Sequence, residues 1–548
     1  MNIKRRDDKV KVKFLLGSVL FGILLSASLV VGGNVDRGVW EFRGFSYIDT
    51  FRFLVYAIVT TIVFYLVLCR IGQASQGLKQ DEFLLRKWIT KSAIIFICWI
   101  PYLLMFYPGN LSVDSYWSIQ QILGNVPLSN AHPIMYTAFV GFFVKIGMTI
   151  KDLEFGIALY SVFQMLVLSV VFGGVCEWLR KRSSKKWIVV LATVFFALNP
   201  LVAMYAITMW KDILFSTWVL LLVVYLYKLL GDEKEVICGT RTRVILSILG
   251  LLVAFGRNNG IYIVCLVYLS LIFYYRKFWK KTIPVFGIVL IFISLVQGPG
   301  YSIIGVQKGN LAESLAVPLQ QIAYTVKHDG EIEESQAEFL ENIIPLDKMA
   351  EVYIPYSANG VKFDSEFDNE FLENNVVEFL KVWGQMLPAN FKNYVKAYLM
   401  HTLGYWHIGT NDWRCIYGVV DSPGIEGIDF IEKITGVDFS ENLSHFIESK
   451  INTIPIINLI YSIAFSVWTV VFAGVCFIES KKSKYLITIL PLIGNWITIM
   501  IASPIFCEFR YMFSLHITLP VIFSMIYFEG FSTSKEDDVV ILERNREE

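Results

Sequence analysis

Long apolar runs are the feature that most constrains this chain. A helix of ~20 apolar residues is long enough to cross ~30 Å of hydrocarbon, and such runs recur throughout the sequence. Of the 548 residues, 55% are hydrophobic, whereas a soluble domain usually contains about 45–50% apolar residues. The sequence therefore predicts an all-α polytopic membrane protein. Twelve transmembrane helices are expected, at residues 14–33, 53–69, 91–107, 155–179, 187–206, 211–230, 244–256, 260–275, 282–299, 452–477, 484–502 and 512–528.

Basic loops orient these helices, because Lys and Arg concentrate on the cytoplasmic side of a membrane. Placing all the basic loops inside gives cytoplasmic N- and C-termini, in a cell membrane. The first apolar run lacks a clear signal-peptide cleavage site, so we expect a retained anchor. The basic loops are RIGQASQGLKQDEFLLRK (70–87), RKRSSKK (180–186), RKFWKK (276–281) and SKKSK (480–484).

The apolar segment 133–150 is an exception. If it crossed the membrane, the basic loop 180–186 would fall outside. It also contains Lys145 and runs directly into KDLE (151–154). We therefore expect a juxtamembrane helix in the outer interface. On the same side, GRNNG (256–260) should form a tight turn between two short helices.

The only large segment without long apolar runs is acidic and follows an outward-going helix. We expect it to form an extracytoplasmic, α-rich domain. The predicted organisation is N-terminal transmembrane helices (1–106), a first catalytic outer loop (107–154), a transmembrane core (155–299), the extracytoplasmic domain (300–451), C-terminal transmembrane helices (452–530) and a cytoplasmic tail (531–548).

Metal and nucleotide motifs are not evident. The eight cysteines have no framework spacing and fit small buried hydrophobic side chains. His401 and His407 are six residues apart, a poor ligand spacing on one helix. The sequence contains no GxGxxG or P-loop motif that would bind a nucleotide sugar.

Unusual polar residues gather at the predicted outer ends of the apolar runs. A charge at mid-membrane costs about 2.5–3.5 kcal/mol on insertion scales, so such groups persist when they pair or line a wet cavity. Their common depth suggests one polar site. The residues are Asp114, His132, Lys211, Asp212, Arg257, Asn258, Asn259, Glu313, Glu508, Arg510 and Tyr511.

Each of these residues also has a structural interpretation. Asp114 lies where a helix begins and could serve only as its N-cap. His132 could be a turn residue, and Arg257 could extend to the lipid headgroups. Lys211-Asp212 could anchor a helix at the interface, and Glu508 with Arg510 could form an ion pair only.

Several stretches resemble the GT-C superfamily, the polytopic glycosyltransferases that use polyprenyl-phosphate-linked sugars. The similarity is greatest to an uncharacterised branch found in Gram-positive bacteria. It spans residues 107–520 and rests on short motifs in a common order. They are YPGNLSVDSYWSIQQ (107–121), SNAHPIMYTAFVG (129–141), NPLVAMYAITMWKD (199–212), GRNNGIY (256–262), ESLAVPLQQIA (313–323) and CEFRYMFSLHITLP (507–520).

The resemblance implies an essential acid in the first large outer loop, followed by juxtamembrane helices, and Asp114 occupies that position. The chain departs from the pattern in having one Asp where many members have an acidic pair. It also has HPI in place of HPP, and two extra N-terminal helices. No cofactor is implied with certainty, and a divalent cation stays possible. One loop carboxylate is a weak basis for a metal site, because a protein-bound cation takes several oxygens.

The expected reaction is an inverting sugar transfer, with Asp114 as the general base. Lys211, Arg257, Arg510 and His132 would bind the donor phosphate. The acceptor would be a cell-envelope glycan or polymer, and Tyr405, Trp406 and Trp413 could stack on sugar rings. Sugar- or acceptor-binding candidates are Asp212, Asn258, Asn259, Glu313, Gln320, Tyr405, Trp406, Glu508 and Tyr511.

Three other functions remain open at this point. A flippase for lipid-linked sugars would need polar residues along mid-membrane and an internal repeat. A glycan polymerase or ligase would share nearly all of the chemistry. A non-catalytic envelope scaffold would not require the paired charges at the outer edge.

Overall fold

The computed structural model describes residues 2–74, 81–183, 185–231, 237–411, 418–450, 453–502 and 505–529. Within these ranges the protein is mostly helical with almost no sheet, which confirms the predicted all-α class. The strands described there are β1 (Val35–Asp36) and β2 (Glu41–Phe42), which pair antiparallel in one short hairpin. The predicted cytoplasmic tail lies outside the described residues, as does Trp413.

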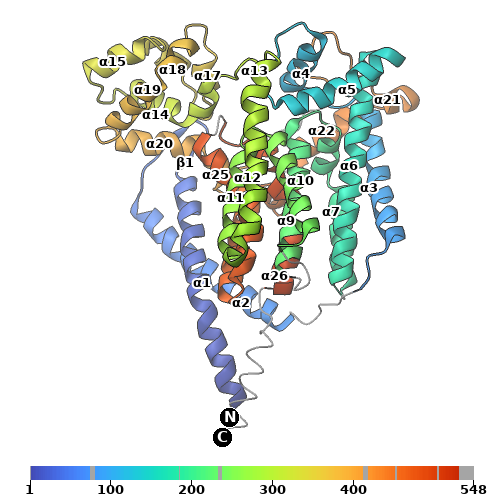
Figure 1. Ribbon diagram of the computed structural model, residues 1–548. Coiled ribbons are helices and arrows are strands. Elements are labelled where there is room, and N and C mark those ends of the chain that lie inside the picture. The colour runs from blue at the N-terminus through green and yellow to red at the C-terminus, as the bar shows by residue number, and fades with distance from the viewer. Residues whose placement is uncertain are drawn as a thin grey trace.

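Eight helices in the described ranges are long and apolar enough to cross a membrane. Most of them run roughly along one direction in a single bundle (Figure 1). Many of their Leu, Ile, Val and Phe side chains are exposed, as suits lipid contact. This is a multi-pass membrane protein. Five of the spans lie in α1 (Asn2–Gly33), α2 (Tyr47–Ala74), α3 (Leu85–Met105), α6 (Leu153–Arg182) and α9 (Lys211–Gly231). The other three extend a 17-residue helix by the helical turns next to it: Arg276–Ile303 contains α12 (Trp279–Leu295), Ser483–Ala502 contains α25 (Leu486–Ala502), and Phe509–Glu529 contains α26 (Phe513–Glu529).

The remaining predicted spans are shorter or broken. The predicted span 187–206 is a bent pair, α7 (Lys186–Leu198) and α8 (Pro200–Ala206), with a 55° bend at Asn199. Three others coincide with α10 (Thr240–Gly256), α11 (Gly260–Tyr274) and α24 (Ile463–Glu479), of 15 to 17 residues each. Counting the bent pair as one span gives nine candidates in the described ranges, so the number twelve stays a prediction.

The predicted tight turn joins α10 to α11 through residues 257–259. Gly260 makes this turn possible, because a Cβ at that position would lie 2.0 Å from the carbonyl oxygen of Val253. The backbones of the two helices therefore approach too closely for any side chain there. This approach places Arg257 at the end of α10, facing the start of α9.

The first loop carries two helices, α4 (Val113–Leu123) and α5 (Ile134–Ile150), which pack on each other. Both lie at one end of the bundle, beside the end of α6 (Figure 1). A helix therefore occupies the segment for which a juxtamembrane helix is predicted. It is apolar and 17 residues long, and its position relative to the membrane stays a prediction.

Residues 311–405 form a lobe of short helices at the same end of the bundle (Figure 1). Segment 418–450 leaves this lobe and runs beside the first loop, where Leu111 pairs with Val419 and Tyr107 with Ile428 in isolated β-bridges. The lobe contains α14 (Ala316–Lys327), α15 (Glu334–Glu341), α16 (Leu346–Val352), α17 (Asn359–Lys362), α18 (Asn369–Asn374), α19 (Val376–Met386) and α20 (Phe391–His401), and the departing segment contains α21 (Phe430–Thr435) and α22 (Phe439–Lys450).

Candidate functional site

Asp114 is the second residue of α4, but it does not cap that helix. Ser112 occupies the N-cap with extended backbone, and its backbone N–H donates to the Ser115 hydroxyl at 3.3 Å. The Ser112 hydroxyl in turn accepts a hydrogen bond from Trp210 Nε1 at 2.8 Å. Because Ser112 performs the capping, the carboxylate of Asp114 is available for other partners.

Two cations from distant parts of the chain bind one oxygen of that carboxylate. Arg510 Nη1 lies 2.7 Å from Asp114 Oδ2, and Lys211 Nζ lies 3.1 Å from the same atom. Lys211 begins α9, and Arg510 lies in the short 3₁₀ helix η7 (Phe509–Met512) before α26. The ends of two apolar helices therefore bring both cations to the start of α4.

His132 extends this group on the far side of Lys211. Its Nδ1 lies 2.8 Å from Lys211 Nζ. Because an ammonium group only donates, Nδ1 is the acceptor and the ring proton is on Nε2. Burial and the adjacent charge of Lys211 lower the pKa of His132 to about 4. The ring is therefore neutral near pH 7.

The pKa of Asp114 reflects two opposing effects. Burial raises it, but the charges of Arg510 and Lys211 and the hydrogen bond from Lys211 outweigh burial. The pKa therefore lies well below its ordinary value, and Asp114 is a carboxylate at any physiological pH. In this state it is also a weak base, because its negative charge is already stabilised by two cations.

A second ion pair lies beside the first. Arg257 Nε is 3.1 Å from Asp212 Oδ1, and the Asp212 side chain is only 1% exposed. The guanidinium of Arg257 lies over the ring of Tyr511, 4.5 Å from its centroid. A carboxylate buried this deeply needs a charged partner, so Arg257 is held at the site and does not extend into the headgroups.

Arg510 connects the two pairs. Its guanidinium lies 4.8 Å from the Trp210 ring and 5.2 Å from the Tyr511 ring. Its Nε is 3.6 Å from Glu508 Oε1, beyond hydrogen-bond distance. Burial raises the pKa of Glu508 above its ordinary value. We call the seven residues of this network the charge cluster: Asp114, His132, Lys211, Asp212, Arg257, Glu508 and Arg510.

Two predicted asparagines border the charge cluster without joining it. Asn258 Nδ2 donates to the backbone oxygen of Asn130 at 2.9 Å, close to His132 in the sequence. Asn259 Nδ2 donates to Thr498 Oγ1 at 2.7 Å. Both therefore fix the α10–α11 turn against neighbouring segments.

The other predicted sugar-binding residues have partners within the lobe or near it. Glu313 accepts from Lys362 Nζ at 2.6 Å, and Gln320 donates to the backbone oxygen of Ile354 at 2.7 Å. The Tyr405 ring is fully buried, and its hydroxyl donates to the Ile505 oxygen at 2.9 Å. Trp406 Nε1 contacts the Thr402 hydroxyl at 3.1 Å. Buried as they are, Gln320 and Tyr405 present no surface to a sugar in this conformation.

The lobe contacts the segments that carry the charge cluster. The backbone N–H of Asn130 donates to the oxygen of Gln307, just before the lobe, at 2.8 Å. On another side, Phe506 N–H donates to the oxygen of Tyr356 at 2.9 Å, two residues before Glu508. The residues just before the lobe therefore support the loop that holds His132, and the lobe itself supports the segment before η7.

Sequence reasoning missed Ser112 and Trp210, which hold Asp114 and Arg510 in place. The available signal was the aromatic residue directly before the Lys-Asp pair in TMWKD, since Arg often stacks on Trp. Ser112 was visible as a cap candidate two residues before Asp114, but the sequence alone did not decide between the two.

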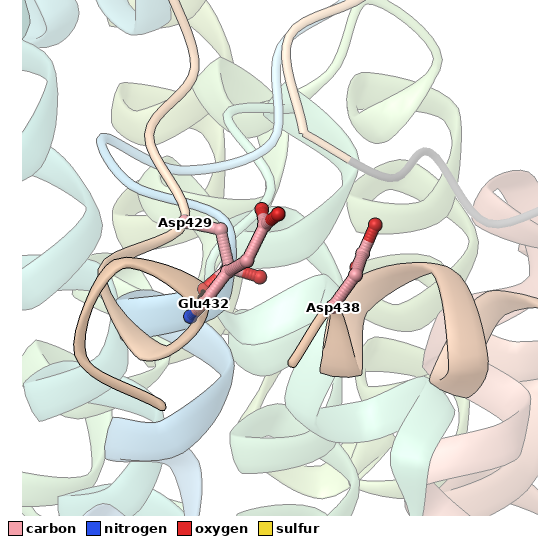
Figure 2. A group of neighbouring side chains, drawn as sticks. All are labelled: Asp429, Glu432 and Asp438. Atoms are coloured by element: carbon pink, nitrogen blue, oxygen red, sulfur yellow. Dashed lines mark hydrogen bonds between the residues drawn. The ribbon is translucent and has the colours of Figure 1, made fainter. Parts of the chain in front are cut away.

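A group of three carboxylates, not anticipated from the sequence, lies away from the charge cluster. Figure 2 shows Asp429, Glu432 and Asp438 at the beginnings of two helices. One carboxylate oxygen of each residue lies within 4.8 Å of the others. Asp429 Oδ1 accepts from the backbone N–H groups of Ile431 and Glu432 at 2.8 Å. Asp438 Oδ1 accepts from the Glu441 N–H at 2.7 Å. Capping of α21 and α22 accounts for both aspartates.

Comparison with known proteins places most of this site within one family. Residues 124–539 match a family described as "Family of unknown function (DUF6020)". No curated protein and no solved structure matches the chain. The matched range includes every member of the charge cluster except Asp114, which precedes it by ten residues.

Proposed function

The chain belongs to the DUF6020 family, and we propose that it is an integral-membrane glycosyltransferase of the GT-C type. It transfers a sugar from a polyprenyl-phosphate-linked donor to a glycan or polymer of the cell envelope, on the outer face of the cell membrane. The observation that carries this proposal is the position of Asp114. A carboxylate able to accept a proton lies within 3.1 Å of two cations at the ends of apolar helices.

The cations suit the leaving group of such a reaction. When the bond between the anomeric carbon and the phosphate oxygen breaks, the lipid phosphate takes the electron pair and gains negative charge. Arg510 and Lys211 stabilise that charge, with Arg257 next to them. A lipid-linked donor also fits the sequence, which has no nucleotide-sugar motif, and the location, because the donor's tail lies in the membrane beside the site.

Asp114 becomes a competent base when the donor binds. The donor phosphate competes with the carboxylate for Lys211 and Arg510, and the loss of their full charge raises the pKa of Asp114 toward its ordinary value. Asp114 then accepts the proton of the acceptor hydroxyl as its oxygen attacks the anomeric carbon from the side opposite the phosphate. A positioned base typically contributes about 10²–10⁴-fold to the rate.

The lobe is the natural place for the acceptor. It contacts the segment before Glu508, and the residues just before the lobe contact the His132 loop, so it is linked to two of the segments that carry the charge cluster. Glu313 is half-exposed there and can bind sugar hydroxyls by exchanging its hydrogen bond with Lys362.

The test is transfer by purified protein in nanodiscs, supplied with labelled polyprenyl-phosphate sugar and cell-envelope glycan. Asp114→Asn keeps the size of the side chain and should lower the transfer rate by about 10²-fold or more. The matched control is Asp152→Asn, in the same loop, where the carboxylate caps α6 and pairs with the exposed Lys151.

Each outcome has one interpretation. Release of polyprenyl phosphate with wild-type protein and its loss in Asp114→Asn support the transferase. Full activity of Asp114→Asn contradicts the base assignment. Transfer of whole glycan chains indicates a polymerase or ligase, and movement of the intact lipid across a vesicle membrane without release of phosphate indicates a flippase.

A further inference from the structure

The charges of the cluster balance when no ligand is bound. Its cations are Lys211, Arg257 and Arg510, and His132 is neutral near pH 7. Its acidic residues are Asp114, Asp212 and Glu508, so three basic and three acidic side chains balance in formal charge. A site with no net positive charge is an unexpected place for a phosphate to bind, because the added anion leaves an excess negative charge in a largely buried site.

The three carboxylates are not equally stabilised. Asp114 Oδ2 contacts two cations, at 2.7 and 3.1 Å. Asp212 contacts Arg257 at 3.1 Å. Glu508 has only Arg510 Nε, at 3.6 Å. Of the three, Glu508 therefore lies farthest from a cation.

We infer that an anionic ligand binds the charge cluster together with one proton, and that Glu508 takes up this proton. The inference deepens the proposed function and rests on it for the chemical class of the ligand, a lipid-linked phosphodiester with one negative charge. Protonated Glu508 restores the neutrality of the cluster and leaves Arg510 to divide its charge between Asp114 and the phosphate.

The groups around Glu508 determine whether anion binding raises or lowers its pKa. It faces Arg510 on η7, and the negative charges that act on it come from Asp212 on α9 and Asp114 on α4. The Tyr405 hydroxyl accepts its backbone N–H at 3.2 Å. Burial already raises the pKa of Glu508 in the ligand-free protein, and a nearby anion that draws on Arg510 raises it further.

The sign of the pH dependence follows from this linkage. Glu508 has a higher pKa with the anion bound than without it, so binding takes up a proton at pH values between the two. Affinity therefore falls as pH rises through that window, by up to about tenfold per pH unit for one proton. Below the pKa of Glu508 in the free protein, and above its pKa in the complex, Glu508 contributes nothing to the change of affinity with pH.

The experiment uses the purified full-length protein in nanodiscs and farnesyl methyl phosphate as the probe. This diester carries a single charge and has no proton to exchange near neutral pH. Calorimetric titrations in two buffers of different ionisation enthalpy measure the protons taken up, and titrations from pH 5 to 8 measure the slope. Glu508→Gln should take up no proton and should bind with a flat pH profile, at least as tightly as wild type at the alkaline end. Glu378→Gln, an exposed carboxylate on the lobe paired with Lys381, should behave as wild type.

The outcomes separate this inference from the proposed function. Saturable binding without proton uptake by wild type overturns the inference and leaves the donor site standing, and it requires no variant to fold. Uptake that persists in Glu508→Gln but is lost in Asp114→Asn assigns the proton to Asp114 and overturns the role of Glu508. Absence of saturable binding by wild type overturns both.

Discussion

At the scale of single residues, Asp114 can form ion pairs because its neighbour Ser112 caps α4. Ser112 and Asp114 both have side chains that cap helices well, and the sequence SVDS is compatible with either. The backbone decides for Ser112, which is extended while Val113 begins the helix. The carboxylate is thereby left to Lys211 and Arg510. A sequence does not reveal this choice, because a shift of two residues in the helix start exchanges the two roles.

We expect Trp210 to position both Ser112, next to Asp114, and Arg510. Its indole N–H holds Ser112, and its ring lies against Arg510. Trp210→Phe removes the hydrogen bond and keeps a smaller aromatic ring beside Arg510. The net contribution of such a hydrogen bond is about 0.5–1.5 kcal/mol, so transfer should fall by a few-fold to about tenfold. Trp210→Leu also removes the ring from Arg510 and should raise KM for the lipid-linked donor. Steady-state kinetics with varied donor concentration measure both effects.

Ser112→Ala provides the control for this prediction, because it removes the same hydrogen bond from the other partner. Ser112→Ala also removes the cap of α4. The double variant with Trp210→Phe should be no worse than the more impaired single variant, since Ser112→Ala already removes the hydrogen bond that Trp210→Phe removes. Additive losses, or an unchanged donor KM in Trp210→Leu, would show that Trp210 acts only through general packing.

At the scale of helices, the gathering of charges at one end of the bundle could be predicted, but their pairing could not. Each charged residue follows or precedes an apolar run, so the topology alone brings them to similar depth. Which cation meets which acid depends on the angles and distances between helices. Arg257 binds Asp212 because Gly260 brings α10 and α11 together, and Glu313 instead binds Lys362 of the lobe.

Gly260→Ala should therefore disturb the site through the packing of two helices. A Cβ 2.0 Å from the Val253 oxygen forces α11 away from α10, at a cost of about 1–3 kcal/mol for such overpacking. The apparent melting temperature should fall, and transfer should fall with it because Arg257 moves from Asp212. Gly287→Ala is the matched control. It lies inside α12, where a Cβ meets nothing within 4 Å, and should be neutral or slightly stabilising. Equal melting temperatures for the two variants would contradict the close approach.

At the scale of the whole molecule, hydropathy located the helices better than it counted the spans. Helices occupy all twelve predicted segments, but α10, α11 and α24 are shorter than a straight crossing requires, and Pro200 follows the break at Asn199. Short and bent helices have the same composition as full spans, so composition does not separate them. Segment 300–451 also shows a limit of sequence reasoning. It was expected to form one domain, and its last part packs beside the first loop through backbone pairing that no side-chain pattern signals.

Sidedness is the property on which the proposed chemistry depends most. If the α4 end of the bundle faces outward, no nucleotide sugar reaches it and a lipid-linked donor is required. In a background without the eight native cysteines, a membrane-impermeant thiol reagent should label Glu334→Cys on the lobe in intact cells. Ser483→Cys, in the basic loop before α25, should react only after permeabilisation. The reverse pattern would place the charge cluster in the cytoplasm and remove the argument for the lipid-linked donor.

The same labelling tests whether α5 crosses the membrane. Asn125→Cys and Lys151→Cys, on either side of α5, should both react in intact cells as Glu334→Cys does, because a juxtamembrane helix leaves its two ends on one side. Labelling of those two positions from opposite sides would make α5 a span and would invert every helix that follows it.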